Sequence, residues 1–122
     1  MEAESRQHLT EAFDRRDLER FIELLDPDVV WTGLQRSGEP TPVCRNRDEV
    51  REVFERALAA GRTGSPLIVA EQGDAVVIDP RAEPVLEGQE ELHHVYTFGR
   101  GRIVAMRDYP NRRSALEAVG LR

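Results

Sequence analysis

The sequence predicts an α+β fold: a cone-shaped, curved and mostly antiparallel sheet wraps around three N-terminal helices and encloses an internal pocket. Three helical segments come first, with one strand inserted between the second and the third. Almost everything after residue 64 then has the β-branched, turn-bounded pattern of strands. At 122 residues the chain has the length of one domain, so we expect a single unit over residues 1–122 that buries about two-thirds of its unfolded surface.

Three stretches have the apolar spacing of helices. Residues 2–15 carry an apolar stripe on one side. Asp17 caps a second helix, which ends at residues 26–28 because the central proline forces its predecessor out of the helical region. Asn46 opens a third helix with a glutamate three residues later, and Gly61 follows at the C-terminal cap position.

The remaining elements are shorter and are bounded by glycine, proline and acidic residues. Strands are predicted at residues 29–32, 67–70 and 75–78, a loop at 33–43, an edge, bulge or loop at 79–88, and a short tail helix at 114–119.

Residues 92–108 predict a β-hairpin around a Gly-Arg-Gly-Arg tetrad. Two-residue loops suit the strand twist, with either Arg100-Gly101 as a type I′ turn or Gly99-Arg100 as a type II′ turn. The second avoids an arginine at positive φ. Both pair odd-numbered with even-numbered residues, so the inner face would hold His93, Val95, Thr97, Val104, Met106 and Asp108. The other face would hold His94, Tyr96, Phe98, Ile103, Ala105 and Arg107. A three-residue loop with a bulge would instead place His94 beside Asp108.

Composition limits the classes of partner. The net charge of −6 argues against nucleic acid and anionic membrane surfaces, and no apolar run is long enough to span a bilayer. The single cysteine, Cys44, excludes an internal disulfide and favours a reducing, cytoplasmic setting. Three histidines, two of them adjacent, do not form a metal-binding cluster, and no phosphate-binding loop follows a strand. We therefore expect no metal and no cofactor.

At this point the chain resembles the nuclear transport factor 2-like superfamily, and its SnoaL-like members in particular. Residues 17–31, with Leu25-Asp26-Pro27-Asp28-Val29-Val30-Trp31, look like the start of such a domain. Residues 101–109 look like its closing strand, and residues 112–121 are similar to the tail of SnoaL-like members. The resemblance follows the order of elements along the whole chain and implies the cone fold. Relatives include polyketide cyclases, ketosteroid isomerases, limonene-epoxide hydrolases and non-catalytic binding modules.

Asp108 is the residue that the resemblance singles out. Its run Arg107-Asp108-Tyr109 matches the Arg-Asp-Tyr run that holds a pocket carboxylate in the epoxide hydrolases. The nearest match to their second motif, Arg-x-Asp, is Arg81-Ala82-Glu83, which departs from it. The isomerase pattern of a tyrosine beside a second acid is not visible, because Tyr96 would face away from Asp108.

The residues themselves support a catalytic pair of Asp108 and His93. An acid beside Met106 and Val95 would be desolvated, which favours acid–base work, and His93 could be its proton partner. The expected ligand-binding wall is Trp31, Val95, Thr97, Val104 and Met106. A simpler alternative stays open for each: Asp108 as a backbone acceptor, His93 as a strand histidine and Trp31 as core.

The sequence leaves two candidate functions open. The first is a small cofactor-independent enzyme that acts on a small, largely apolar or amphipathic molecule, by isomerase, cyclase or hydrolase chemistry, with Asp108 moving the proton. The second is a non-catalytic ligand-binding or dimerisation module. In either case we expect a homodimer through the outer sheet face, which would carry Tyr96, Phe98 and Ile103.

Overall fold

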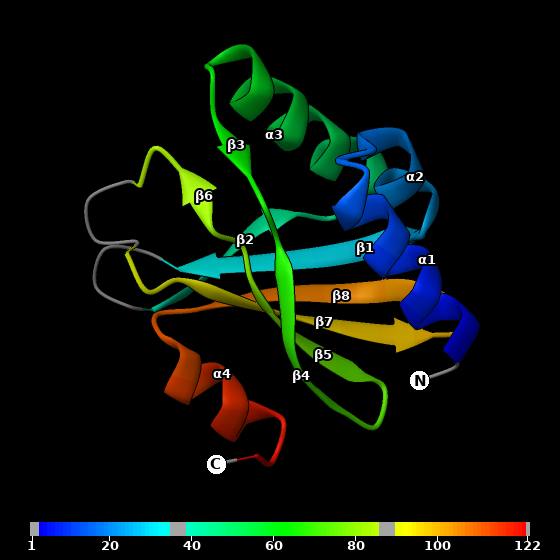
Figure 1. The fold of residues 1–122 in the computed structure, drawn as a ribbon, viewed down its shortest axis with the longest axis vertical. Coiled ribbons are helices and arrows are strands. Elements are labelled where there is room, and N and C mark those ends of the chain that lie inside the picture. The colour runs from blue at the N-terminus through cyan, green and yellow to red at the C-terminus, as the bar shows by residue number, and fades with distance from the viewer. Residues whose placement is uncertain (1–2, 35–38, 86–89, 122) are drawn as a thin grey trace.

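The computed structural model describes residues 3–34, 39–85 and 90–121. Its helices are α1 (Ala3–Asp14), α2 (Leu18–Glu23), α3 (Arg47–Ala59) and α4 (Arg112–Ala118). Its strands are β1 (Leu25–Leu34), β2 (Pro40–Cys44), β3 (Thr63–Gly64), β4 (Leu67–Gln72), β5 (Ala75–Asp79), β6 (Ala82–Glu83), β7 (His93–Gly99) and β8 (Arg102–Tyr109). The predicted α+β fold is confirmed, with helices first and a curved sheet after them (Figure 1).

Six strands form one sheet in the order β2-β1-β8-β7-β5-β4, and β3 pairs with β6 separately. Neighbouring strands run antiparallel except β1 and β8, which are parallel. Pairing between β1 and β8 is irregular from Leu25 to Val30, where the Asp-Pro-Asp run interrupts the ladder. The parallel pairing places Trp31 next to Met106, so the first and last strands meet in the middle of the sheet.

The predicted caps are present. Asp17 accepts a hydrogen bond from the Arg20 amide, and Asn46 accepts one from the Glu49 amide. The Glu49 side chain reaches back to the Arg45 amide at 2.7 Å, one residue before the expected partner. Gly61 follows α3 with φ +80°, which a glycine adopts without strain.

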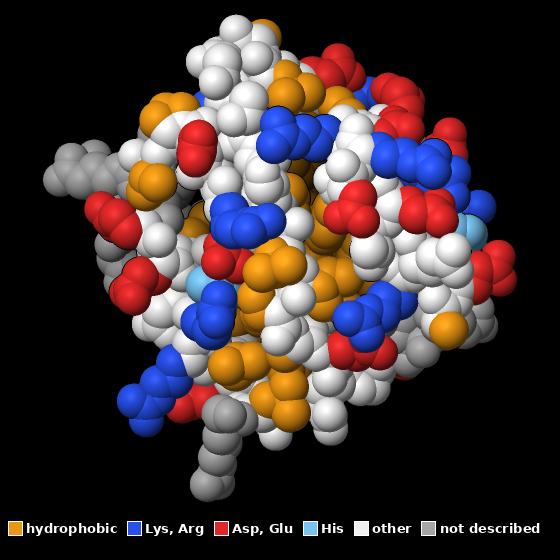
Figure 2. All heavy atoms as spheres, viewed as in Figure 1, with side chains coloured by type: hydrophobic (Ala, Val, Ile, Leu, Met, Phe, Trp, Pro, Cys, Tyr) orange, Lys and Arg blue, Asp and Glu red, His pale blue; other side chains and the backbone are white. Residues whose placement is uncertain are grey.

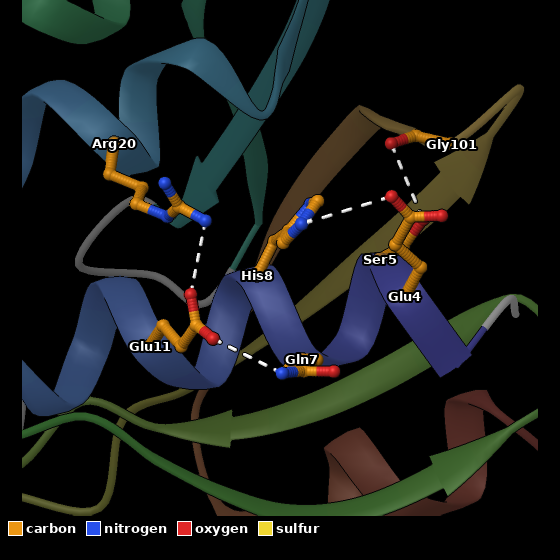
Figure 3. Close-up of polar contacts among 7 residues, drawn as sticks. All are labelled: Glu4, Ser5, Gln7, His8, Glu11, Arg20 and Gly101. Atoms are coloured by element: carbon orange, nitrogen blue, oxygen red, sulfur yellow. Dashed lines mark hydrogen bonds and ion pairs between the residues drawn. The ribbon is translucent and has the colours of Figure 1, made fainter.

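Polar contacts tie helix α1 to neighbouring elements (Figure 3). Glu11 Oε2 lies 3.0 Å from Arg20 Nη2, which ties α1 to α2. Ser5 Oγ donates to the Gly101 carbonyl oxygen at 3.5 Å, which ties α1 to the turn between β7 and β8. His8 lies on α1 beside Glu4, so this third histidine is on a different element from the histidines of β7.

The main core lies between the sheet and helices α1, α2 and α3. Leu9, Ile22, Leu25, Val50 and Ile103 are fully or almost fully buried there. Aromatic rings fill the rest, including Phe21 against Tyr96 at 5.8 Å and Trp31 stacked on Phe54 at 5.7 Å. These rings dominate the burial on this face because each one removes a large apolar area from water.

Helix α4 covers part of the opposite face. Ala115 is fully buried against Val77 and Val95, with Tyr109 and Leu116 partly buried around them. Because Val77 and Val95 alternate with the core residues Val76 and Tyr96, α4 lies on the outer face of the sheet.

The prediction of a loop at residues 33–43 is wrong in part. Strand β1 continues to Leu34, and Pro40 begins β2, which pairs with β1 at one edge of the sheet. Proline is tolerated there because an edge strand need not donate every amide hydrogen bond. The tail helix starts earlier than predicted, at Arg112, because Asn111 caps it. Within the predicted segment 79–88, residues 86–88 lie outside the described part of the chain.

The hairpin has the predicted strands but a different register. Arg100 (φ 56°) and Gly101 (φ 78°) form a type I′ turn, so the less strained type II′ alternative is wrong. Thr97 then pairs with Ala105 while Phe98 pairs with Ile103, which leaves Val104 as an extra residue, a β-bulge. The bulge lets both Ile103 and Met106 face the core, which a regular strand forbids for residues three apart.

Because of this bulge, the predicted face assignment is wrong for most residues. Asp108 and Met106 do face the core side, but their partners are His94 and Tyr96. His93, Val95 and Thr97 lie on the outer face, and Val104 lies against the outer side of Gly99. Tyr96, Phe98 and Ile103 are buried in the core, so they are not an outer surface for dimerisation.

The turn offers a direct stability test. Replacing Arg100 with asparagine should raise the free energy of unfolding by about 1 kcal/mol, because a long side chain is disfavoured at positive φ and Asn-Gly suits a type I′ turn. Urea unfolding measures the difference. Arg102→Asn, in the adjoining strand, is the control and should give no gain; equal effects of the two changes would mean that the turn is not type I′.

Candidate functional site

Asp108, near the end of β8, is held by two side chains on the core side of the sheet. Its Oδ1 accepts a hydrogen bond from Trp31 Nε1 at 2.8 Å and lies 2.6 Å from His94 Nδ1. Three strands supply these groups: Asp108 is paired with His94 of β7, and Trp31 comes from the adjoining β1. One carboxylate oxygen therefore binds both rings, and the other remains available.

The pair of His94 and Asp108 is largely withdrawn from water. Each side chain is 13% exposed. An ionised carboxylate only accepts hydrogen bonds, so the proton between them belongs to His94 Nδ1 when the imidazole is neutral. This leaves the lone pair of His94 at Nε2, at the far end of the ring from Asp108.

Aromatic rings fix His94 on both sides. Trp31 meets it edge-on at 6.2 Å and 86°, and Tyr96 stacks on it at 6.1 Å and 19°. Trp31 is itself stacked on Phe54 of α3. The histidine ring is therefore oriented by packing and by its bond to Asp108, as a catalytic base requires.

Tyr96 belongs to the same cluster. Burial, followed by the negative charge of Asp108, raises the pKa of the Tyr96 phenol well above its usual value. The phenol consequently keeps its proton at neutral pH and can act only as a neutral donor or acceptor. The prediction that Tyr96 faces away from Asp108 is wrong.

Three polar atoms in this cluster are free to meet a ligand. Asp108 Oδ2, His94 Nε2 and Tyr96 Oη take part in no hydrogen bond within residues 3–34, 39–85 and 90–121. The buried side-chain nitrogen and oxygen atoms without a partner in that part of the chain are Arg20 Nε and Arg62 Nε. The three free atoms are not among these, so each keeps some contact with solvent.

Gly33 lies beside the second carboxylate oxygen of Asp108. A Cβ at this position would lie 3.4 Å from Asp108 Oδ2, an ordinary contact, and only 2.6 Å from Cγ2 of Val43. A side chain there would therefore require Val43 of β2 to move. Sequence reasoning did not single out Gly33, because nothing in the sequence shows what packs against it.

His93, predicted as the partner of Asp108, has a different role. Its side chain lies on the outer face, where Nδ1 is 2.7 Å from the Glu91 carbonyl oxygen and Arg112 Nε donates to Nε2 at 3.2 Å. Arg112 also lies 3.5 Å from Asp79, so it is not simply a solvated helix end. These contacts anchor the start of α4 to the sheet.

The structure brings together only part of the predicted ligand-binding wall. Trp31 and Met106 lie beside Asp108 on the core side. Val95, Thr97 and Val104 are on the other face and cannot contact the same ligand there. The main prediction left His94 and Tyr96 out of the site, whereas the alternative with a bulge placed His94 beside Asp108, as the structure has it.

Among the residues that the structure describes, two surface hollows stand out, and neither is lined by Asp108 or His94. One, of about 1020 Å³, is lined by residues of α4 and the turn after it. The other, of about 460 Å³, lies between α1 and Glu71. The internal pocket beside Asp108 stays a prediction.

Other candidate chemistries have little support. In the described part of the chain, His, Cys, Asp and Glu side chains do not gather in threes as a metal site would need. Cys44 is buried at the end of β2, and burial together with Glu49 raises the pKa of its thiol. No helix in residues 3–34, 39–85 and 90–121 combines the length and hydrophobicity that a bilayer crossing needs.

Several solved structures share this fold. IdmH of Streptomyces antibioticus, described as a candidate polyketide cyclase, is 23% identical, with 98% of each chain covered and a TM-score of 0.58. A protein of Mesorhizobium loti described as a candidate SnoaL-like polyketide cyclase is 16% identical, with 88% of this chain and 97% of that one covered and a TM-score of 0.67. A hypothetical protein of Catenulispora acidiphila with a ketosteroid isomerase-like fold, in complex with trimethylamine, is 16% identical, with 100% of this chain and 96% of that one covered and a TM-score of 0.56.

These likenesses establish the fold and leave the activity open. The comparison with curated proteins finds no match. The comparison with protein families finds a match to the SnoaL-like domain over residues 6–106. This range is most of the chain and includes β1, β7 and most of β8. The resemblance inferred from the residues is thus confirmed, and the chain belongs to the SnoaL-like domain family.

Proposed function

We propose that the chain is a cofactor-independent enzyme that moves a proton on a small, largely apolar molecule, with the pair of His94 and Asp108 as the proton-transfer unit. The observation that carries the proposal is the shared Asp108 Oδ1, bound by Trp31 and His94, while His94 Nε2 and Asp108 Oδ2 stay free. A base oriented by a carboxylate on its far side is the arrangement used for general acid–base catalysis.

The reaction type that fits best is proton removal next to a carbonyl group, as in isomerisation or cyclisation of a ketone. His94 Nε2 would take the proton from carbon, and Asp108 would stabilise the imidazolium that forms. Tyr96, which keeps its own proton, could donate a hydrogen bond to the oxygen on which charge develops. Asp108 Oδ2 is the alternative base, as the sequence predicted.

The test follows proton exchange rather than a named product. Apolar ketones are incubated with the protein in D₂O, and loss of the α-proton signal is followed by NMR. The wild-type chain should catalyse exchange on at least one ketone of the panel, and Asp108→Asn should not. Tight binding of a ketone without exchange would contradict the proposal and favour a non-catalytic binding module of the same fold.

A homodimer through the outer sheet face stays part of the proposal, but the residues at its interface differ from those that the sequence predicted. Val30 is 45% exposed and pairs with Ala105, which in turn pairs with Thr97, so a partly apolar strip is left beside α4. Light scattering at micromolar concentration should give twice the chain mass of 13.9 kDa. A single-chain mass would remove the dimer from the proposal.

A further inference from the structure

Two arginines from different segments converge on Ser65, which follows β3. Arg16, in the turn between α1 and α2, donates from Nη2 to Ser65 Oγ at 3.0 Å. Arg81, just before β6, donates from Nε to the Ser65 carbonyl oxygen. The pairing of β3 with β6 brings Arg81 opposite Ser65, so three segments distant in sequence meet here.

Arg16 and Arg81 are among the arginines of this acidic chain that have no carboxylate partner in the described residues. Arg6, Arg20, Arg51, Arg112 and Arg113 each form an ion pair with an aspartate or glutamate. Arg16 and Arg81 form no ion pair within the described residues, and each donates a single side-chain N–H to Ser65. A guanidinium has five N–H donors, so most of this hydrogen-bonding capacity is unused.

A third arginine adds to the local positive charge. Arg62 stands three residues before Ser65 and has no ion pair in the described part of the chain; its Nε is buried there without a hydrogen-bond partner. Arg16 and Arg81 also have left-handed backbones, with φ of 51° and 44°, which side chains with a Cβ disfavour. Such strained positions, when surrounding structure maintains them, are often found at binding sites.

Two hydrophobic residues are close in sequence to these contacts: Phe13 comes shortly before Arg16, and Ile68 shortly after Ser65. Phe13 of α1 and Ile68 of β4 are both partly buried against the main core, on the helix side of the sheet. Figure 2 shows hydrophobic side chains along the middle of the face that carries α1 and β4, with arginine and acidic side chains around them. The face therefore places arginine side chains beside an apolar strip.

We propose that Arg16 and Arg81, positioned by Ser65, bind the oxyanion group of an amphipathic small molecule whose apolar part lies against Phe13 and Ile68. The oxyanion is a carboxylate or a phosphate, for which planar guanidinium groups are suited. The inference goes beyond the proposed function, because binding at this site needs neither His94 nor Asp108.

The experiment compares octanoate, octyl phosphate and 1-octanol by isothermal titration calorimetry at constant ionic strength. The two anions should bind the wild-type chain at least about tenfold more tightly than the neutral alcohol, since one charge-assisted contact is typically worth that much. The preferred anion identifies the source of the oxyanion. Arg16→Gln and Arg81→Gln should each remove most of this preference, while circular dichroism confirms that they fold.

Two further variants serve as controls. Arg113→Gln removes an exposed arginine that is paired with Glu117 on α4, and it should leave anion binding unchanged. His94→Gln should also leave it unchanged, which separates this site from the proposed catalytic pair. Equal affinity for octanoate, octyl phosphate and octanol, or equal loss in Arg113→Gln and Arg81→Gln, would overturn the inference.

Discussion

His94→Gln should lower the rate of ketone α-proton exchange by about 10²–10⁴-fold, the range that a positioned general base contributes. Glutamine keeps a similar length and can still hydrogen-bond Asp108, but it has no ring nitrogen that takes up a proton. The rate loss should therefore come without loss of the fold. NMR exchange rates in D₂O, with the melting temperature measured in parallel, check both parts of this expectation.

The adjacent histidine provides a matched control. His93→Gln makes the same chemical change one residue away, on the outer face, where glutamine can still accept a hydrogen bond from Arg112. Exchange should continue at nearly the wild-type rate. If His93→Gln lowers the exchange rate as much as His94→Gln does, the pairing of β7 with β8 does not decide which histidine acts as the base.

Trp31→Ala should lower the free energy of unfolding by about 3–5 kcal/mol, the usual cost of removing a large buried ring. Trp31 is 9% exposed, stacks on Phe54 and donates its indole N–H to Asp108. The alanine variant loses the packing and leaves Asp108 with one partner fewer. Urea unfolding, followed by circular dichroism because the chain has no other tryptophan, measures the loss.

Trp31→Phe separates the two contributions. Phenylalanine keeps much of the ring packing but donates no hydrogen bond, so it should cost about 1.5–3 kcal/mol, the range for hydrogen bonds to charged groups. If Trp31→Ala costs less than about 1 kcal/mol, the indole contributes little to the core and the description of β1 is wrong.

The fold was predictable because its signals are local. Asp17 and Asn46 begin their helices as caps do, and β4, β5, β7 and β8 carry the β-branched runs that predict strands. The parallel contact between β1 and β8 was not predictable, since it joins segments about 75 residues apart and depends on the whole sheet. Strand β2 was missed because its two prolines are acceptable only at an edge.

Part of the candidate site was predictable from the sequence. Asp108 faces the core side, as expected, and Trp31 lies against it. Its histidine was assigned to the wrong neighbour, because Ile103 and Val104 are both apolar and either could continue the inward pattern. Only the packing of Ile103, which is completely buried, decides between them. Arg112 and Gly33 depend on contacts across the fold for which the sequence has no local signal.

The bulge at Val104 also matters for comparing this chain with its relatives. An extra residue at this point is absorbed without moving its neighbours, since Phe98 stays opposite Ile103 and Thr97 opposite Ala105. A relative that lacks the residue can thus keep the same inward-facing side chains in a regular strand. For such a relative, an alignment that counts positions from the turn would shift the acid of β8 by one residue and leave the histidine of β7 in place. An alignment anchored on the Arg-Asp-Tyr end of β8 would keep the two opposite each other.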